Sequence, residues 1–145
     1  MSAALDLQVL ENWLLNRYTS ATCVKHHVPV EPSSHQFCLT LKKEERYTET
    51  ALTMRTQRQF EISYWHNDPE EALAVMDDAA QSWYEDKGIR LPSGDYAMRL
   101  LSFTYAPLQT ASELYGCLGT LTVEQRIQQH QEPVAKMGAI ETAFQ

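Results

Sequence analysis

Two cysteine–histidine pairs are the residues whose types and spacing come closest to a chemical site. His26 follows Cys23 after three positions, and Cys38 follows His35 after three positions. Four nitrogen and sulfur ligands are what a tetrahedral zinc ion requires. Both pairs fall in segments expected to be extended, where residues three apart point to opposite faces of a strand. The spacing therefore favours surface or core roles, and we predict no metal ion and no cofactor.

A nucleophile or an acid–base pair would be the other kind of catalytic site. Cys117 lies in an apolar segment and is expected to be a small buried hydrophobic residue. The sequence has no nucleophile elbow, P-loop or dinucleotide-binding glycine pattern. The carboxylate pairs Asp77-Asp78 and Glu85-Asp86 fall on the polar side of a predicted helix, and nothing selects them as a catalytic pair. We therefore predict no catalytic residue and no enzyme.

Composition narrows the protein class further. The chain has 145 residues and a formal net charge of −7, with 43% apolar residues, which suits one ordinary domain. No basic stripe is present, so tight binding of a phosphate backbone is not expected. No apolar run reaches the roughly 18 residues of a membrane span, and the first residues do not resemble a secretory signal. Three widely spaced cysteines suggest the reducing cytosol.

Two helices are predicted, over residues 5–18 and 69–87. Either Ser2 or Asp6 is suited to cap the first. The second follows Asp68 as its N-cap and has proline at its first position. Its apolar stripe is expected to contain Leu73, Met76, Ala80, Trp83 and Tyr84, widened by Ala72, Val75 and Ala79.

The strands are less regular. Alternating apolar residues predict strands over 36–41, 58–66, 96–105 and 115–123, and in the third of these Leu101, Phe103 and Tyr105 are expected on one face. The polar, proline-containing segment 22–30 is confined to an edge or an end of the sheet. Residues 42–58 are charged and rich in threonine, which suits a long hairpin arm or a mobile loop.

These elements predict the α+β class. We expect a mostly antiparallel sheet of four to five strands, with an N-terminal helix and one long central helix packed on it, and an extended C-terminal tail. Residues 1–126 would form a single domain and residues 127–145 a C-terminal extension.

Some apolar residues lack an obvious partner within such a domain. Trp65 falls on the polar side of its strand, and Met137, Ile140 and Phe144 recur in the tail. A cluster of exposed apolar residues suggests a protein interface. The alternative is that the tail folds back on its own domain.

The order of elements over Leu5 to Arg126 resembles one group of viral proteins. A helix leads to the proline-containing stretch Val24–Val30. The strand Phe60-Glu61-Ile62-Ser63-Tyr64-Trp65 runs directly into the capped helix that begins Asp68-Pro69-Glu70-Glu71-Ala72. Two strands follow, the first ending Tyr105-Ala106-Pro107 and the second containing Leu118-Gly119-Thr120-Leu121-Thr122-Val123. This order is similar to that of the tail terminator (tail completion) proteins of long-tailed bacteriophages, which overlap with minor capsid and tail-to-head joining proteins.

The resemblance implies a virion structural protein without catalytic activity, assembled in the host cytoplasm and located in the neck of the virion. It implies a homo-hexameric ring on the last ring of the tail tube, which stops tube growth and presents a surface to the head–tail connector protein. DNA would be only a passing cargo, for which an acidic channel is suitable. Residues 42–58 would correspond to a loop that in this family often reaches the ring lumen or a neighbour. No functional residue is carried over, because the family has no catalytic signature.

Three other hypotheses remain open at this point. The protein could be a head-side joining protein. It could be a small ligand-binding or enzymatic α+β domain with a pocket between the central helix and the sheet, lined by Tyr64, Trp83, Tyr84 and Phe103. It could also be an interaction module stapled by zinc.

Overall fold

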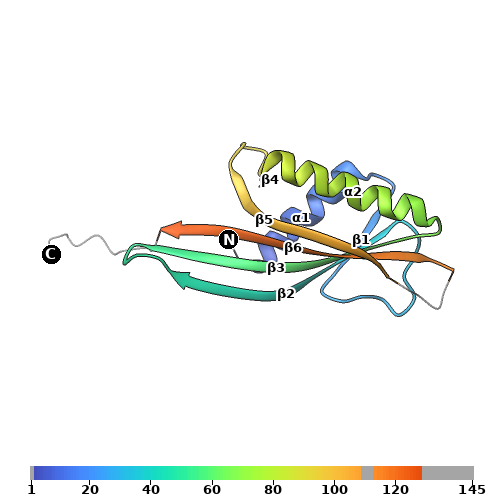
Figure 1. Cartoon of the computed structure of the whole chain (residues 1–145), viewed down its shortest axis with the longest axis horizontal. Helices are drawn as coiled ribbons and strands as arrows, with labels where there is room; N and C mark the ends of the chain where they lie inside the picture. Colours follow the sequence, from blue (N-terminus) through green and yellow to red (C-terminus); the bar gives the residue numbers. More distant parts are fainter. Residues whose placement is uncertain (1, 109–112, 129–145) are drawn as a thin grey trace, which may run out of the picture. The chain divides into compact units, whose positions relative to one another are not determined.

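A computed structural model describes residues 2–108 and 113–128 of the chain. Within them lie two helices and six strands. Figure 1 labels each of them. In chain order these are α1 (Ala3–Arg17), β1 (Thr22–Lys25), β2 (Gln36–Thr48), β3 (Thr53–His66), α2 (Pro69–Asp86), β4 (Gly88–Arg90), β5 (Tyr96–Leu108) and β6 (Tyr115–Gln128). The C-terminal residues Met137, Ile140 and Phe144, predicted to form an interface, lie outside the described residues.

The six strands form one mixed sheet in the order β1-β2-β3-β6-β5-β4. β1 pairs with β2 in parallel, whereas β4 with β5 and β5 with β6 are antiparallel. Strands account for about half of the described residues. The prediction of four to five mostly antiparallel strands is therefore wrong. Segment 22–25 joins the sheet in parallel, and a three-residue strand, β4, follows α2 directly.

The chain separates into two compact units. The first contains Met1–Glu45 and Gln57–Gln125, and the second contains Arg46–Thr56 and Arg126–Gln145. We call Arg46–Thr56, the end of the β2–β3 hairpin, the hairpin tip.

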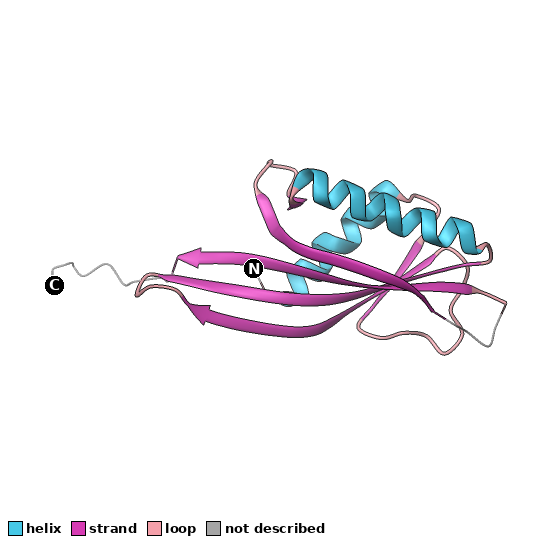
Figure 2. Ribbon diagram, viewed as in Figure 1, coloured by secondary structure: helices cyan, strands magenta, loops and turns pink. Residues whose placement is uncertain are grey.

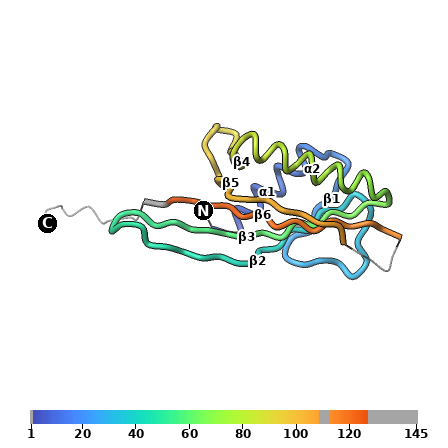
Figure 3. The backbone as a smooth tube through the Cα atoms, in the orientation of Figure 1, coloured from blue at the N-terminus to red at the C-terminus, as the bar shows by residue number. Residues whose placement is uncertain are grey.

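In the first unit both helices lie on one face of the sheet (Figure 2). Ser2 caps α1 by accepting a hydrogen bond from the Leu5 amide, and Asp68 caps α2 by accepting one from the Glu70 amide. α2 ends at Lys87, in the left-handed region at φ 61°, and Gly88 follows at φ 148°. A Cβ on Gly88 would lie 2.2 Å from the Met98 carbonyl oxygen, so glycine is required where the chain turns from α2 into the sheet (Figure 3).

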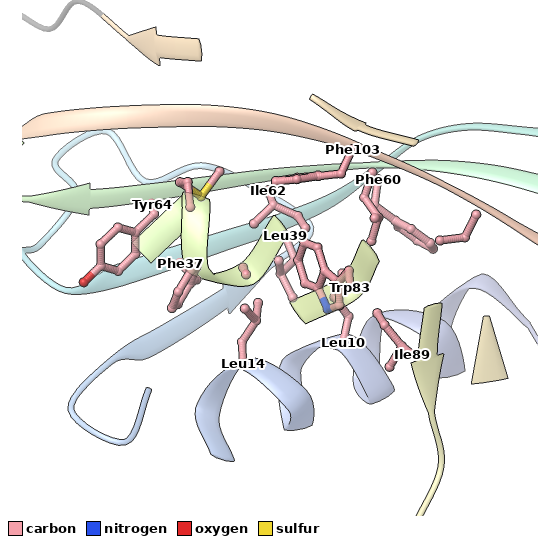
Figure 4. Packing of buried hydrophobic residues seen from close by; sticks show 14 of the residues in the cluster. Leu10, Leu14, Phe37, Leu39, Phe60, Ile62, Tyr64, Trp83, Ile89 and Phe103 are labelled. Carbon is pink, nitrogen blue, oxygen red and sulfur yellow. The ribbon is translucent and has the colours of Figure 1, made fainter. Parts of the chain in front are cut away.

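The core of this unit lies between the helices and the sheet. Three α1 leucines spaced by three and four residues face it, together with apolar side chains from β2, β3 and α2 (Figure 4). The largest fully buried side chains are Leu7, Leu10, Leu14, Phe37, Leu39, Phe60, Ile62, Met76, Trp83, Ile89, Met98 and Leu121. At about 1.5–3 kcal/mol for each buried large side chain, this layer supplies the main stabilisation of the unit.

Two predicted apolar faces are wrong in part. On α2 the buried residues are Ala72, Met76, Ala79 and Trp83, whereas Leu73 is 40% and Tyr84 51% exposed. Small alanines occupy the inner face because α2 packs closely on the sheet, and this turns Leu73 outward. On β5 a register shift between Leu100 and Ser102 leaves Leu101 42% exposed, so Leu101 does not share the inner face with Phe103.

Residues 42–58 were expected to form either a hairpin arm or a mobile loop, and the structure distinguishes the two. β2 continues to Thr48 and β3 begins at Thr53, so the alternative of a long hairpin arm is confirmed. In the turn, the amides of Glu49 and Thr50 both donate to the Thr53 carbonyl oxygen. Within the second unit Glu49 also forms an ion pair with Arg126, at 3.1 Å. The polar side chains pair with one another, which explains why a strand forms there without an apolar face.

Candidate functional site

The first cluster of charged groups in the first unit is centred on the buried ion pair of Asp6 and Arg58, with Glu44 partly exposed at its edge. Arg58 donates through Nη1 to Asp6 at 2.5 Å and through Nε to Glu44 at 2.5 Å. Gln125 donates through Nε2 to the other Asp6 oxygen at 3.0 Å and to the carbonyl oxygen of Ala97 at 2.6 Å. Both Asp6 and Arg58 are buried. The cluster thereby joins α1 to β2, β3, β5 and β6.

This cluster holds the fold together rather than presenting reactive groups. Burial raises the pKa of Asp6, against the opposing effect of the Arg58 guanidinium. Sequence reasoning missed the cluster, because Asp6 was considered only as a helix cap. The sequence of β3 does indicate the cluster, because Arg58 lies two and four residues before Phe60 and Ile62 and therefore faces the same side of the sheet as these apolar residues. A charged residue on an inward face predicts a buried partner.

The two cysteine–histidine pairs do not come together. Cys23 is paired with Phe37 in the parallel register, and Cys38 lies one residue further along β2, so the two thiols point to opposite faces of the sheet. His26 and His35 both have positive φ, at 77° and 61°, in the segment that connects the strands. Burial raises the pKa of the Cys23 thiol to about 12. Among residues 2–108 and 113–128, no three histidine, cysteine or acidic side chains gather as ligands.

A different pair of imidazoles lies at the end of β3. The rings of His35 and His66 pack edge to face, with centroids 4.2 Å apart. His66 Nδ1 accepts a hydrogen bond from the Asp68 amide at 2.9 Å, so in neutral His66 the ring proton is on Nε2. Ser34 Oγ lies 3.2 Å from His35 Nδ1 and also accepts from the Asn67 amide. These contacts position the start of α2, and the sequence did not predict them.

Trp65 is not an exposed apolar residue. It is 8% exposed, and the prediction that places it on an open polar face is wrong. Its ring lies over Gly116 of β6, where a Cβ would be 2.5 Å from the ring edge. Cys38 and Ser63, which share its side of the sheet, are buried as well. The end of the sheet therefore has a small second apolar layer on the face opposite the helices.

The aromatic residues considered for a pocket pack against one another. Trp83 and Phe103 form an edge-to-face pair at 5.0 Å, and Trp83 also contacts Trp13 at 5.1 Å. Tyr64 lies 4.5 Å from Phe37. These rings fill the space between α2 and the sheet, as a core does.

Three of the exposed apolar side chains, Leu73, Tyr84 and Leu101, lie on α2 and β5. Leu73 and Tyr84 are eleven residues apart on α2, and eleven residues are close to three full turns, so both lie on one side of the helix. Tyr84 Oη accepts a hydrogen bond from the Phe103 amide at 3.0 Å, which shows that this amide points away from β6. The backbone amide of Tyr105, two residues further along β5, points away from β6 in the same way. We call Leu73, Tyr84, Leu101 and the outer edge of β5 the assembly surface.

Comparison with known proteins assigns no family to this chain. Within the described part of the chain, neither helix has the length and apolar composition that crossing a membrane requires. No protein-family model matches the chain, and no curated protein sequence matches it significantly.

Proposed function

We propose that this chain is a structural protein of a long-tailed bacteriophage virion. In this role it is a tail terminator: copies of the chain form a ring that caps the tail tube and joins it to the head connector. It performs no catalysis, and DNA only passes through the ring.

The assembly surface is the observation that carries this proposal. Leu73, Tyr84 and Leu101 are each at least 40% exposed, and the Phe103 amide bound by Tyr84 points away from β6. Exposed apolar side chains beside the edge of a sheet are typical of a surface that is covered by another protein. A ring protein needs such a surface on each copy.

The element order supports the same role. α1 is followed by the β2–β3 hairpin, β3 enters α2 through two residues, and β5 and β6 complete the sheet. This is the order on which the resemblance to tail terminators rests. The hairpin tip, with exposed Arg46, Thr48 and Glu49, would correspond to the segment that contacts the lumen or a neighbour.

The test is co-expression with the tail tube protein encoded in the same genome. We expect electron microscopy to show tubes of limited length with the tagged chain only at one end. A Leu73→Glu/Leu101→Glu variant should melt at nearly the same temperature and fail to cap. Leu5→Glu, which changes a 54% exposed residue on α1, is the matched control and should cap normally.

The head-side joining role predicts a different result in the same experiment. The chain would then bind isolated head connectors and leave tube length unchanged. Tubes of unlimited length, with no chain at their ends, would contradict the tail-terminator proposal.

A further inference from the structure

Two arginines share one tyrosine ring at the β4–β5 hairpin. The guanidinium carbon of Arg90 lies 4.0 Å from the Tyr96 ring centroid, and that of Arg99 lies 4.3 Å from it. Arg90 also donates to the Tyr96 hydroxyl oxygen and to the Gly94 carbonyl oxygen. Tyr96 Oη donates in turn to the Asp86 carbonyl oxygen at the end of α2, at 2.8 Å. We call the side chains of Arg90, Tyr96 and Arg99 the arginine cluster.

Arg90 and Arg99 are exposed, and neither forms an ion pair with a carboxylate within the described residues. The carboxylate that the strand register places opposite Arg99 is that of Glu124 on β6, which is buried. Two cations held on one ring repel each other unless an anion lies close to both. The net charge of the chain is −7, so the charge of this cluster has the opposite sign to that of the chain as a whole. The cluster is therefore suited to bind carboxylates of a protein partner.

The first half of α2 carries the complementary charges. Glu70 and Asp77 are seven residues apart, on one side of the helix, with the exposed Leu73 between them. Neither carboxylate forms an ion pair in the described part of the chain. The sixteen residues from Glu70 to Asp86 span about 24 Å of helix. Glu70 is therefore beyond reach of the arginine cluster of its own copy, and Asp77, about 14 Å from Asp86 along the helix, forms no ion pair with that cluster.

We infer that the arginine cluster of one copy binds the Glu70–Leu73–Asp77 face of α2 on the next copy. This inference rests on the proposed ring. The two patches differ, one on the first half of α2 and one beside its C-terminal end, so the contact is head-to-tail and repeats from copy to copy. Arginine provides the planar, multiple donors that carboxylates accept, and Leu73 adds apolar area between them. Charge complementarity of this kind lets a strongly acidic chain associate with itself.

Charge-reversal variants test the pairing directly. Arg90→Glu/Arg99→Glu and, separately, Glu70→Arg/Asp77→Arg should each raise the concentration needed for assembly at least tenfold, as measured by mass photometry. The quadruple variant, which reverses both patches, should assemble as the wild type does. Assembly of the wild type should weaken as salt is raised from 50 to about 500 mM, because exposed charge pairs are screened.

Two controls separate binding from folding. Glu31→Arg/Glu113→Arg reverses two exposed acids elsewhere in the chain and should leave assembly unchanged. The melting temperatures of the variants should stay close to that of the wild type. If the cluster served only to hold the end of α2, the variants would lower the melting temperature and leave assembly intact. Where Arg90→Glu/Arg99→Glu fails to fold, Arg99→Glu alone serves, since this guanidinium forms no hydrogen bond within the described residues.

The outcomes distinguish this inference from the proposed function. Capped tubes whose assembly is insensitive to both double variants would overturn the pairing and leave the tail-terminator role intact. Loss of assembly in both double variants without recovery in the quadruple variant would also overturn the pairing. A wild-type chain that stays monomeric, alone and with tube protein, would contradict both.

Discussion

Arg58 Nη1 lies 2.5 Å from Asp6 Oδ2, although 52 residues separate them in the sequence. The contact is enclosed between α1 and β3, and both side chains are almost completely buried. A charge removed from water in this way is tolerated because its partner and further hydrogen bonds, here from Gln125, are in place. The position of α1 on the sheet therefore depends on one ion pair as well as on its leucines.

Removing one member of this pair should be strongly destabilising. We expect Asp6→Ala to lower the free energy of unfolding by about 3–5 kcal/mol, because Arg58 would remain buried without its carboxylate. Urea denaturation followed by circular dichroism measures the change. The double variant Asp6→Leu/Arg58→Met is the control and should lose less than Asp6→Ala does. Equal stability of Asp6→Ala and the wild type would show that the pair is solvated in solution.

Asp6 and Asp78 should respond to acid in opposite directions. Hydrogen bonds from Arg17 and Tyr18 lower the pKa of Asp78 below 3.8, so its contribution to stability is present at neutral pH and is lost as the pH falls through the lowered value. Burial raises the pKa of Asp6, so the native state takes up a proton more readily than the unfolded state. Its contribution to stability therefore increases as the pH falls from the raised value towards 3.8.

Two asparagine variants test these signs. Asp78→Asn should reduce the loss of stability between pH 5 and about 3, by no more than about 1 kcal/mol because its side chain is 48% exposed. Asp6→Asn should make the same loss steeper. The free energy of unfolding is measured in urea at each pH. An identical pH dependence in the wild type and both variants would contradict the assignment.

Trp65 should behave as a core residue. Trp65→Ala is expected to cost about 3–5 kcal/mol of stability, since a large buried ring leaves a cavity beside Gly116. Gly116→Ala should also destabilise, because its Cβ would meet the ring at 2.5 Å. Thermal denaturation measures both. A Trp65→Ala variant with unchanged melting temperature would restore the view of Trp65 as an exposed residue.

Glycine at the end of α2 is the most restrictive backbone position. Gly88→Ala should lower the free energy of unfolding by several kcal/mol, because its Cβ would lie 2.2 Å from the Met98 carbonyl oxygen at a positive φ. Gly94 also has a positive φ, at 96°, but has no atom within 4 Å of the Cβ position. Gly94→Ala should therefore cost only about 1 kcal/mol. Similar losses for the two variants would contradict this reading of the turn.

The sequence predicted what depends on local periodicity and capping. Asp68 and Pro69 located the start of α2, and the alternation of Phe60, Ile62 and Tyr64 located the buried part of β3. The edge position of β1 was predicted for residues 22–30, but its parallel pairing was not, because that pairing depends on distant residues of β2. β4 has only three residues, which is too short for a periodic pattern.

The assembly surface was also hard to predict, because it depends on contacts between elements that are distant in the sequence. Leu73 and Leu101 read as core residues from their spacing, and only the close packing of Ala72 and Ala79 and the β5 register shift turn them outward. The arginine cluster combines residues from two strands around Tyr96. Such contacts depend on the pairing of β4 with β5, which no local pattern specified.

The most direct test of the central proposal is the mass of the assembled chain. Native mass spectrometry would be applied to the purified protein, alone and after release from the ends of tubes formed with its tail tube protein. The account predicts one closed assembly, most simply six copies, present at tube ends and stable on dilution. A monomer under both conditions, or a chain that never associates with tubes, would contradict it.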